Sequence, residues 1–176
     1  MKRAIFLDRD GVINSTIIKK GKPFSPRRLE DFELVDGIKD ILERFRVRGL
    51  LNIIVTNQPD IARGLMKKEE LRKMHNLIRE NLPVDDIFIC PHDDADNCSC
   101  RKPKPGMLLE AAKKWDIDLS ESFMIGDSWK DIEAGRNAGC TTLLIDSPYN
   151  KQIDSDLRAN ELSAVAEIIL NSQKKE

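Results

Sequence analysis

Short apolar runs alternate with amphipathic segments along this chain. Apolar residues at helical spacing predict five helices, over Ile38–Arg48, Lys68–Leu82, Met107–Trp115, Asp131–Ala138 and Leu162–Leu170. Five short apolar runs predict buried strands: Ala4–Leu7, Leu51–Val55, Ile87–Cys90, Phe123–Ile125 and Thr141–Ile145. This alternation, with short connections, predicts an α/β fold with a doubly wound, mostly parallel sheet. In such a sheet ligands bind at the carboxyl ends of the strands.

The length of 176 residues and the ordinary composition predict a single domain over residues 1–176, ending in a polar tail over 171–176. Residues 14–36 form a long, weakly patterned connection whose length allows it to lie over the ligand site. The net charge of −1 provides no basic field for nucleic acid. The first apolar run is too short for a signal peptide, and no run is long enough to span a membrane. We therefore expect a cytoplasmic, monomeric protein with a small-molecule substrate and neither nucleic-acid nor membrane partners.

Two aspartates, Asp8 and Asp10, follow the first predicted strand directly, and Gly11 marks a turn. Carboxylates two residues apart in extended backbone point to the same side, so both can approach one metal ion and one phosphoryl group. This arrangement suits a reaction in which one carboxylate attacks phosphorus, a second moves protons, and Mg²⁺ offsets the negative charge.

Further polar residues follow other predicted strands, or the loop after one: Thr56-Asn57, Arg101-Lys102 and Gly126-Asp127. With the two aspartates they offer a nucleophile, a second carboxylate, a hydroxyl, a cation and another acid, which are the groups that phosphoryl transfer needs. Asp131, one helical turn beyond Asp127, is placed to orient Lys102 or a metal-bound water. The sequence therefore predicts a phosphoryl-transfer site at one edge of the sheet.

We assign Asp8 as the nucleophile that forms an aspartyl-phosphate. Asp10 would protonate the leaving alkoxide and then deprotonate the attacking water. Thr56 and nearby backbone N–H groups would hold phosphate oxygens, and Lys102 would neutralise the phosphate and the charge of Asp8. Asp127 would bind Mg²⁺ together with Asp8 and the main-chain carbonyl of Asp10.

Each of these pieces also has a plain structural interpretation. Asp-x-Asp occurs in turns and in metal-dependent sugar transferases, Thr56-Asn57 can form a strand-end turn, and Gly126-Asp127-Ser128 can cap a helix. Their coincidence at successive strand ends favours catalysis. A receiver-like phosphoacceptor signalling domain, which uses similar groups around Mg²⁺, is the alternative from a different class. Asp10 argues against it, because a proton shuttle beside the nucleophile speeds dephosphorylation.

A second cluster holds three of the four cysteines and one of the two histidines, namely Cys90, His92, Cys98 and Cys100. Three thiolates and an imidazole make a closed tetrahedral zinc site, which is typical of a structural metal. Reduced core cysteines and a disulfide are the alternatives, but the clustering within one loop, residues 90–100, favours zinc. The ion would rigidify the loop that leads to Arg101 and Lys102. His75 stands outside any ligand pattern, and we expect a surface or partly packed side chain.

These motifs resemble those of the haloacid dehalogenase-type (HAD) phosphatases, in the branch of histidinol-phosphate phosphatases and D-glycero-D-manno-heptose 1,7-bisphosphate phosphatases. The resemblance covers residues 4 to about 145. It rests on six segments: Phe6–Asn14, Thr56-Asn57-Gln58, Ile61-Ala62-Arg63-Gly64, Cys90-Pro91-His92, Cys98–Met107 and Ile125-Gly126-Asp127.

The resemblance implies a Rossmann-like fold without a large cap, one catalytic Mg²⁺ and one structural Zn²⁺ in an inserted loop. It supports the roles assigned above and implies that Asn57, Arg63 and Arg101 contact the substrate, since a second anionic group requires a cation.

Two substrates fit the branch. Ile61–Gly64 and Lys104–Met107 are more similar to the heptose enzymes, whereas the five-residue gap between His92 and Cys98 resembles the histidinol enzymes. Pro59-Asp60 departs from the Ser-Gly that is usual in heptose enzymes. We expect a phosphatase that removes the 7-phosphate of the heptose bisphosphate, with histidinol phosphate or another small sugar phosphate as the alternative.

Overall fold

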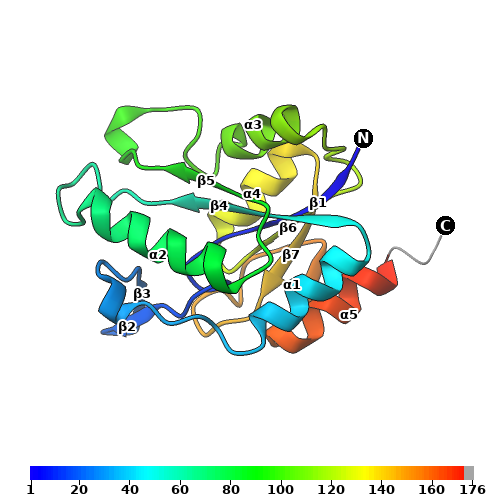
Figure 1. Ribbon diagram of the computed structural model, residues 1–176, viewed down its shortest axis with the longest axis horizontal. Coiled ribbons are helices and arrows are strands. Elements are labelled where there is room, and N and C mark those ends of the chain that lie inside the picture. Colours follow the sequence, from blue (N-terminus) through cyan, green and yellow to red (C-terminus); the bar gives the residue numbers. More distant parts are fainter. Residues whose placement is uncertain (173–176) are drawn as a thin grey trace.

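The computed structural model describes residues 1–172 and contains a six-stranded parallel sheet in the order β5-β4-β1-β6-β7-β8 (Figure 1). The strands are β1 (Arg3–Leu7), β4 (Leu50–Asn57), β5 (Asp86–Cys90), β6 (Phe123–Gly126), β7 (Thr141–Ile145) and β8 (Leu157–Ala159). From β1 the chain first adds strands on one side and then, from β6 onward, on the other. The predicted doubly wound sheet is confirmed, and its switch point lies between β1 and β6, where such sheets bind ligands.

Helices cover both faces of the sheet (Figure 1). One face carries α1 (Ile38–Val47), α2 (Lys68–Asn81) and α5 (Leu162–Ser172), and the other carries α3 (Gly106–Trp115) and α4 (Trp129–Ala138). Side chains of β1 alternate between the two cores: Ile5 and Leu7 pack on the first, Ala4 and Phe6 on the second. Because β1 is buried on both faces, its carboxyl end is a rigid base for the residues that follow.

Several predicted boundaries shift by a few residues. Strand β4 runs on through Thr56 and Asn57, which therefore end the strand instead of following it. Helix α4 begins at Trp129, two residues before the predicted start, because Ser128 and Asp131 form a capping box. Helix α5 reaches Ser172, so the predicted polar tail begins with two helical residues, and residues 173–176 lie outside the described part of the chain.

The 14–36 connection contains an unpredicted hairpin of β2 (Ile17–Lys19) and β3 (Lys22–Phe24), which pair only with each other. The turn between them uses positive φ angles at Lys20 and Gly21. All three residues of β3 are exposed, so the hairpin lacks the apolar alternation that reveals a half-buried strand. The short strand β8 and two 3-10 turns, Leu29–Asp31 and Asp94–Asp96, were likewise not predicted.

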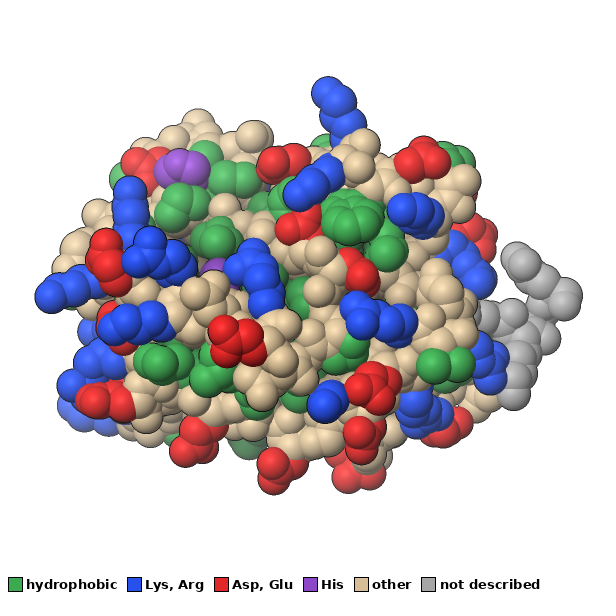
Figure 2. Space-filling view, in the orientation of Figure 1, with side chains coloured by type: hydrophobic (Ala, Val, Ile, Leu, Met, Phe, Trp, Pro, Cys, Tyr) green, Lys and Arg blue, Asp and Glu red, His purple; other side chains and the backbone are tan. Residues whose placement is uncertain are grey.

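The surface carries charges of both signs, interspersed over the face in Figure 2, with Lys and Arg side chains most frequent at its left end, over the hairpin and the start of α2. Among residues 1–172, no helix has both the length and the apolarity to span a bilayer.

Candidate active site

The turn after β1 brings its aspartates against the end of β6. The N–H of Asp8 donates to the carbonyl oxygen of Ile125 at 2.9 Å, which extends the pairing of β1 with β6. Gly11 has a φ of 91°, and a Cβ at this position would lie 2.2 Å from Asp127 Oδ2. Glycine is therefore required here, both for the backbone conformation and for the close approach of the Asp127 carboxylate.

Lys102 lies at the centre of the site and is almost fully buried. Its Nζ donates to Asp8 Oδ1 at 2.7 Å, to Asp131 Oδ1 at 2.6 Å and to the carbonyl oxygen of Val55 at 2.8 Å. Burial alone would lower the pKa of Lys102, but the charges of Asp131 and Asp8 raise it above its ordinary value. The ammonium therefore stays charged and offsets the two carboxylates.

Asn57 fixes the backbone of Lys102. Its Nδ2 donates to the carbonyl oxygen of Lys102, and its Oδ1 accepts the N–H of the same residue, both at 3.0 Å. This reciprocal pair ties the end of β4 to the loop that follows β5. Asn57 also lines the cavity described below, so it can both position Lys102 and face a ligand.

Three carboxylates, of Asp8, Asp127 and Asp131, place oxygen atoms within 4.8 Å of one another. Burial and the charge of Asp131 hold the pKa of Asp8 well above its usual value, and the same two causes raise the pKa of Asp127 to about 6. A bound cation would offset both the desolvation of these carboxylates and the repulsion between them. Because all the donors are hard oxygens, the set fits Mg²⁺.

Asp131 is the most constrained of the three acids. While Oδ1 accepts from Lys102, Oδ2 accepts from Ser128 N at 3.0 Å and from Ser128 Oγ at 2.6 Å. A Cβ at Gly126 would clash with its side chain at 2.1 Å. The predicted contact of Asp131 with Lys102 is thus present, and its remaining bonds leave Asp8 and Asp127 as the freer carboxylates.

The acids lie at the base of a cavity of about 320 Å³. Asp8, Asp10, Asp127 and Asp131 line it together with Lys102, Arg101 and Asn57. The rest of its lining comes from Thr16, Pro23, Phe24, Ser25, Pro59, Ser128 and Lys130. The 14–36 connection thus borders the cavity, as its length allowed. The individual residues that do so were not predicted, because exposed residues of a weakly patterned segment give no signal. Lys130 was missed because a lysine in a helix is usually solvated.

The remaining candidate residues differ in burial and in whether they line the cavity. Thr56 is fully buried, and its Oγ1 accepts from Gln58 Nε2 at 2.9 Å, so its own O–H proton is left to donate. Arg101 lines the cavity while its Nε donates to Asp94 Oδ1 at 2.7 Å. Arg63 lies outside the described cavity lining and forms a two-pronged pair with Asp93, with N···O distances of 2.8 and 2.6 Å.

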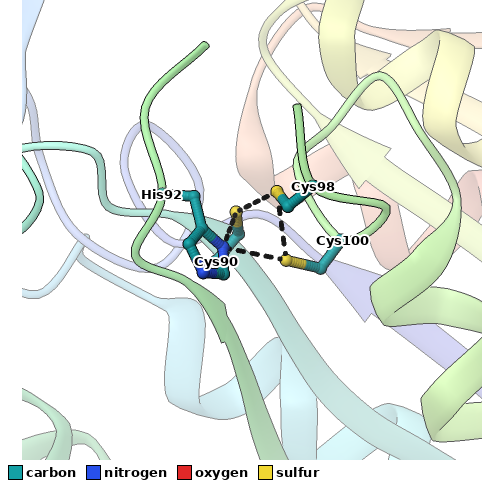
Figure 3. Close-up of side chains that lie close together, drawn as sticks. All are labelled: Cys90, His92, Cys98 and Cys100. Carbon is teal, nitrogen blue, oxygen red and sulfur yellow. Dashed lines mark hydrogen bonds between the residues drawn. The ribbon is translucent and has the colours of Figure 1, made fainter. Parts of the chain in front are cut away.

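The side chains of Cys90, His92, Cys98 and Cys100 lie close together (Figure 3). Cys90 Sγ lies 3.6 Å from both His92 Nδ1 and Cys98 Sγ, and Cys100 Sγ lies 3.3 Å from His92 Nδ1 and 3.4 Å from Cys98 Sγ. A disulfide would require about 2.05 Å, and all four cysteines are free. Ligands around one tetrahedral zinc ion stand about 3.5–3.8 Å apart. The geometry therefore fits a closed metal site.

Known proteins are similar to this chain in sequence. Residues 99–168 match the HAD-hydrolase-like family model. The D-glycero-alpha-D-manno-heptose-1,7-bisphosphate 7-phosphatase of Campylobacter jejuni is 40% identical over 157 residues, which are 86% of this chain and 87% of the relative. The D-glycero-beta-D-manno-heptose-1,7-bisphosphate 7-phosphatase of Helicobacter pylori (strain 26695) is also 40% identical, over 83% of this chain and 86% of its own length.

A solved structure indicates the same family as these sequence relatives. The D,D-heptose 1,7-bisphosphate phosphatase of B. bronchiseptica, whose crystal structure contains magnesium and phosphate, superposes with a TM-score of 0.83 and 31% identity, covering 98% of this chain and 99% of that one. With the strand-end acids, Lys102 and the sulfur cluster in place, this chain belongs to the HAD-type phosphatases, in the family of the D-glycero-D-manno-heptose 1,7-bisphosphate phosphatases.

Proposed function

We propose that this protein is a Mg²⁺-dependent phosphatase that removes the 7-phosphate of D-glycero-D-manno-heptose 1,7-bisphosphate through an aspartyl-phosphate. One observation carries the chemistry: the Lys102 ammonium bridges Asp8 and Asp131 beside Asp127, at the switch point of the sheet. The names of the relatives support the substrate, and the magnesium and phosphate of the B. bronchiseptica enzyme support the metal.

In the first step a carboxylate oxygen of Asp8 attacks phosphorus, and the bond from phosphorus to the sugar oxygen breaks. Asp10 would give a proton to that leaving oxygen. This requires that the bound phosphate dianion raise the pKa of Asp10, which Arg9 and the amides of Asn14 and Gln58 lower, against the effect of burial, in the protein without substrate. In the second step Asp10, now a carboxylate, takes a proton from water, whose oxygen attacks phosphorus and releases inorganic phosphate from Asp8. Lys102 and the Thr56 hydroxyl hold phosphoryl oxygens in both steps.

Asp8, Asp127 and the main-chain carbonyl of Asp10 would hold Mg²⁺, which would offset the negative charge of the phosphate and the carboxylates. The raised pKa of Asp127, caused by burial and by the charge of Asp131, supports this assignment, since the carboxylate gains most from a cation. Asp131 acts through Lys102, because both of its oxygens are already bonded.

The second phosphate of the substrate requires positive charge at the mouth of the cavity. Arg101 and Lys130 line that cavity, and Lys102 is held at its base by Asp8 and Asp131. Arg101 would contact the second phosphate with Nη2, while Asp94 accepts from its Nε and the carbonyl oxygen of His92 accepts from its Nη1. Arg63 would contact the substrate only after its ion pair with Asp93 breaks. Asn57 would contact the sugar or the reacting phosphate.

We further infer that the Cys90–Cys100 loop holds one structural Zn²⁺. Four soft ligands converge there, and a closed four-coordinate site leaves no position for a substrate. Arg101 and Lys102 follow the last ligand directly, so the ion would fix the loop that carries both cations into the cavity.

The test is kcat/KM for the heptose 1,7-bisphosphate anomers, histidinol phosphate and fructose 1,6-bisphosphate, with ³¹P NMR to identify the phosphate that remains. We expect a heptose bisphosphate to exceed the other substrates at least about 100-fold, with the 1-phosphate retained. Higher activity on histidinol phosphate would overturn the substrate.

The Asp8→Asn variant tests the chemistry. It should lose activity by more than about 10⁴-fold, whereas Asp40→Asn, at an exposed position on α1, should keep it. Retained hydrolysis in Asp8→Asn would exclude the aspartyl-phosphate. An aspartyl-phosphate that persists for minutes in the native protein would instead indicate a signalling domain.

A further inference from the structure

Arg9, between the two aspartates, is the largest fully buried side chain in the described chain, with 0% exposure. An arginine in a turn is normally solvated, and a buried guanidinium requires partners that offset its desolvation. Three bonds join it to Asp10: Nε to Oδ1 at 3.1 Å, and Nη2 to Oδ1 at 2.9 Å and to Oδ2 at 3.1 Å. The guanidinium thus grips both oxygens of the carboxylate that we assign to proton transfer.

Two side-chain amides also donate hydrogen bonds to the Asp10 carboxylate. Asn14 Nδ2 donates to Oδ1 at 3.0 Å, and Gln58 Nε2 donates to Oδ2 at 2.9 Å. Gln58 Nε2 also donates to Thr56 Oγ1, so the same amide orients the acid and the hydroxyl expected to hold phosphate. Asp10 still lines the catalytic cavity. Its orientation is therefore set from behind, by groups that do not line the cavity among the described residues.

The other side of Arg9 rests on His75. His75 lies on α2 with 2% exposure, in contrast to the surface or partly packed side chain expected from the sequence. Its Nε2 is 3.3 Å from Arg9 Nη1. A guanidinium can only donate, so Nε2 is the acceptor and the ring is neutral, with its proton on Nδ1. Burial and the charge of Arg9 lower the pKa of His75 to about 3, which agrees with a neutral ring.

The ring of Phe32 closes the remaining face, with the Arg9 guanidinium carbon 5.6 Å from its centroid. Arg9 is therefore fixed by a carboxylate, an imidazole and an aromatic ring that come from three parts of the chain. None of these contacts involves a side chain of β1, whose own side chains pack on the two cores.

We propose that Arg9 and His75 are positioning residues that hold the Asp10 carboxylate in line with the leaving oxygen, so that α2 helps to orient the proton-transfer group. This proposal rests on the proposed role of Asp10. Arginine is suited to it, because its planar fork fixes two oxygens at once and lysine cannot do so. His75 keeps the fork from rotating by accepting from its third nitrogen.

The proposal has a signature that loss of packing lacks. A sugar alkoxide is a poor leaving group and needs a proton from Asp10, whereas 4-nitrophenolate leaves without one. Misplacing Asp10 should therefore slow the first chemical step for a sugar phosphate and spare it for 4-nitrophenyl phosphate. Loss of packing alone would slow both.

The experiment measures release of the leaving group in a single turnover, with enzyme in excess over each substrate. The sugar phosphate is the one that the native enzyme hydrolyses best. The variants are Arg9→Lys, His75→Leu and His75→Gln, with Asp10→Asn as the reference and Ile78→Val as the control for packing on α2.

For Arg9→Lys we expect release from the sugar phosphate to slow at least about 30-fold and release of nitrophenolate to change less than about 3-fold. His75→Leu should give the same pattern at about 10-fold. His75→Gln, whose amide oxygen can accept from Arg9, should recover most of the rate. Ile78→Val should leave the ratio of the two rates unchanged.

Equal slowing of both substrates in folded Arg9→Lys and His75→Leu would overturn the proposal. If Arg9→Lys does not fold, the His75 pair decides alone. If Asp10→Asn itself slows both substrates equally, the assigned role of Asp10 fails, which is a separate result. Selective loss in Asp10→Asn without selective loss in the Arg9 and His75 variants would reject only the positioning role.

Discussion

Two groups of potential metal ligands lie at the carboxyl ends of the strands, and they are assembled in opposite ways. The sulfur cluster comes from one loop of eleven residues, Cys90 to Cys100. The carboxylate cluster joins Asp8 after β1 to Asp127 and Asp131 after β6, which lie 119 and 123 positions further along the chain. The first is local in sequence, and the second exists only because β1 and β6 pair.

The two clusters also differ in what holds them without metal. The carboxylates repel one another, but Lys102 and the hydrogen bonds of Ser128 offset that repulsion. The thiols and His92 have only weak mutual hydrogen bonds, although the Asp94–Asp96 turn and the ion pairs of Asp93 and Asp94 order the rest of the loop. We infer that the fold holds the carboxylate cluster together without metal, whereas the four side chains of the sulfur cluster depend on a bound ion to stay in one arrangement.

The largest expected effect follows from breaking the sulfur cluster. Cys98→Ser should lose the zinc and lower the melting temperature by about 10 °C or more, because metal binding contributes directly to folding free energy. Metal analysis should fall from about one zinc per chain to near zero. The Cys140→Ser variant, a buried cysteine outside the cluster, is the control and should keep its zinc. A stable, active Cys98→Ser protein would contradict the structural role.

The next largest effect is expected from a substitution that disrupts the carboxylate cluster and leaves the sulfur loop intact. Asp131→Asn removes the charge that pairs with the buried Lys102, which should cost about 3–5 kcal/mol of unfolding free energy. We also expect kcat to fall about 100-fold or more, because Lys102 loses its fixed position. Zinc content should be unchanged. Glu133→Gln, on the exposed side of the same helix, should alter neither quantity. Denaturant unfolding and steady-state kinetics check both outcomes.

The smallest expected effect concerns pH. Burial and the charge of Asp131 raise the pKa of Asp127 to about 6, above the value of about 4 expected in the unfolded chain. The folded, metal-free protein therefore holds this proton more tightly, and the contribution of Asp127 to stability should fall as pH rises from about 4 to 6, by at most about 3 kcal/mol. Denaturant unfolding of the native protein and of Asp127→Asn over this pH range isolates that contribution. Saturating Mg²⁺ should remove this loss.

Activity should also depend on the protonation of Asp127, but it should increase with pH over the range in which the contribution of Asp127 to stability decreases. Below about pH 6 a proton competes with Mg²⁺ at Asp127, so the apparent affinity for Mg²⁺ should decrease as pH falls. Raising Mg²⁺ should restore activity on the acid side. An apparent Mg²⁺ affinity that is constant from pH 5 to 7 would contradict the assignment of Asp127 as a ligand.

The sequence predicted what depends on strong local patterns. Buried strands such as β1 and β6 are short apolar runs, and the polar residues that follow them mark the ligand edge whatever the details of packing. The cysteine spacing was equally clear, because its ligands are close in sequence. Of the two partners predicted for Asp131 from its place one helical turn beyond Asp127, Lys102 or a metal-bound water, the contact with Lys102 is present.

What the sequence could not show depends on tertiary neighbours. The burial of Arg9 requires His75 and Phe32, which reach it only after α2 and the 14–36 connection have packed. The β2–β3 hairpin is exposed and lacks periodicity, so only its turn residues mark it. The ion pair between Arg63 and Asp93 forms only once the sulfur loop has folded against the segment that carries Arg63. Substrate contacts by Arg63 stay a prediction.

The hairpin has one more consequence, for the design of new enzymes. Because β2 and β3 pair only with each other, replacing residues 17–24 with a longer or differently charged segment would leave every strand of the main sheet intact. Thr16, Phe24 and Ser25 border the cavity, so such grafts would reshape the entrance without altering Asp8, Lys102 or Asp127. A library of hairpins on this scaffold is thus a direct route to phosphatases with altered substrate preference.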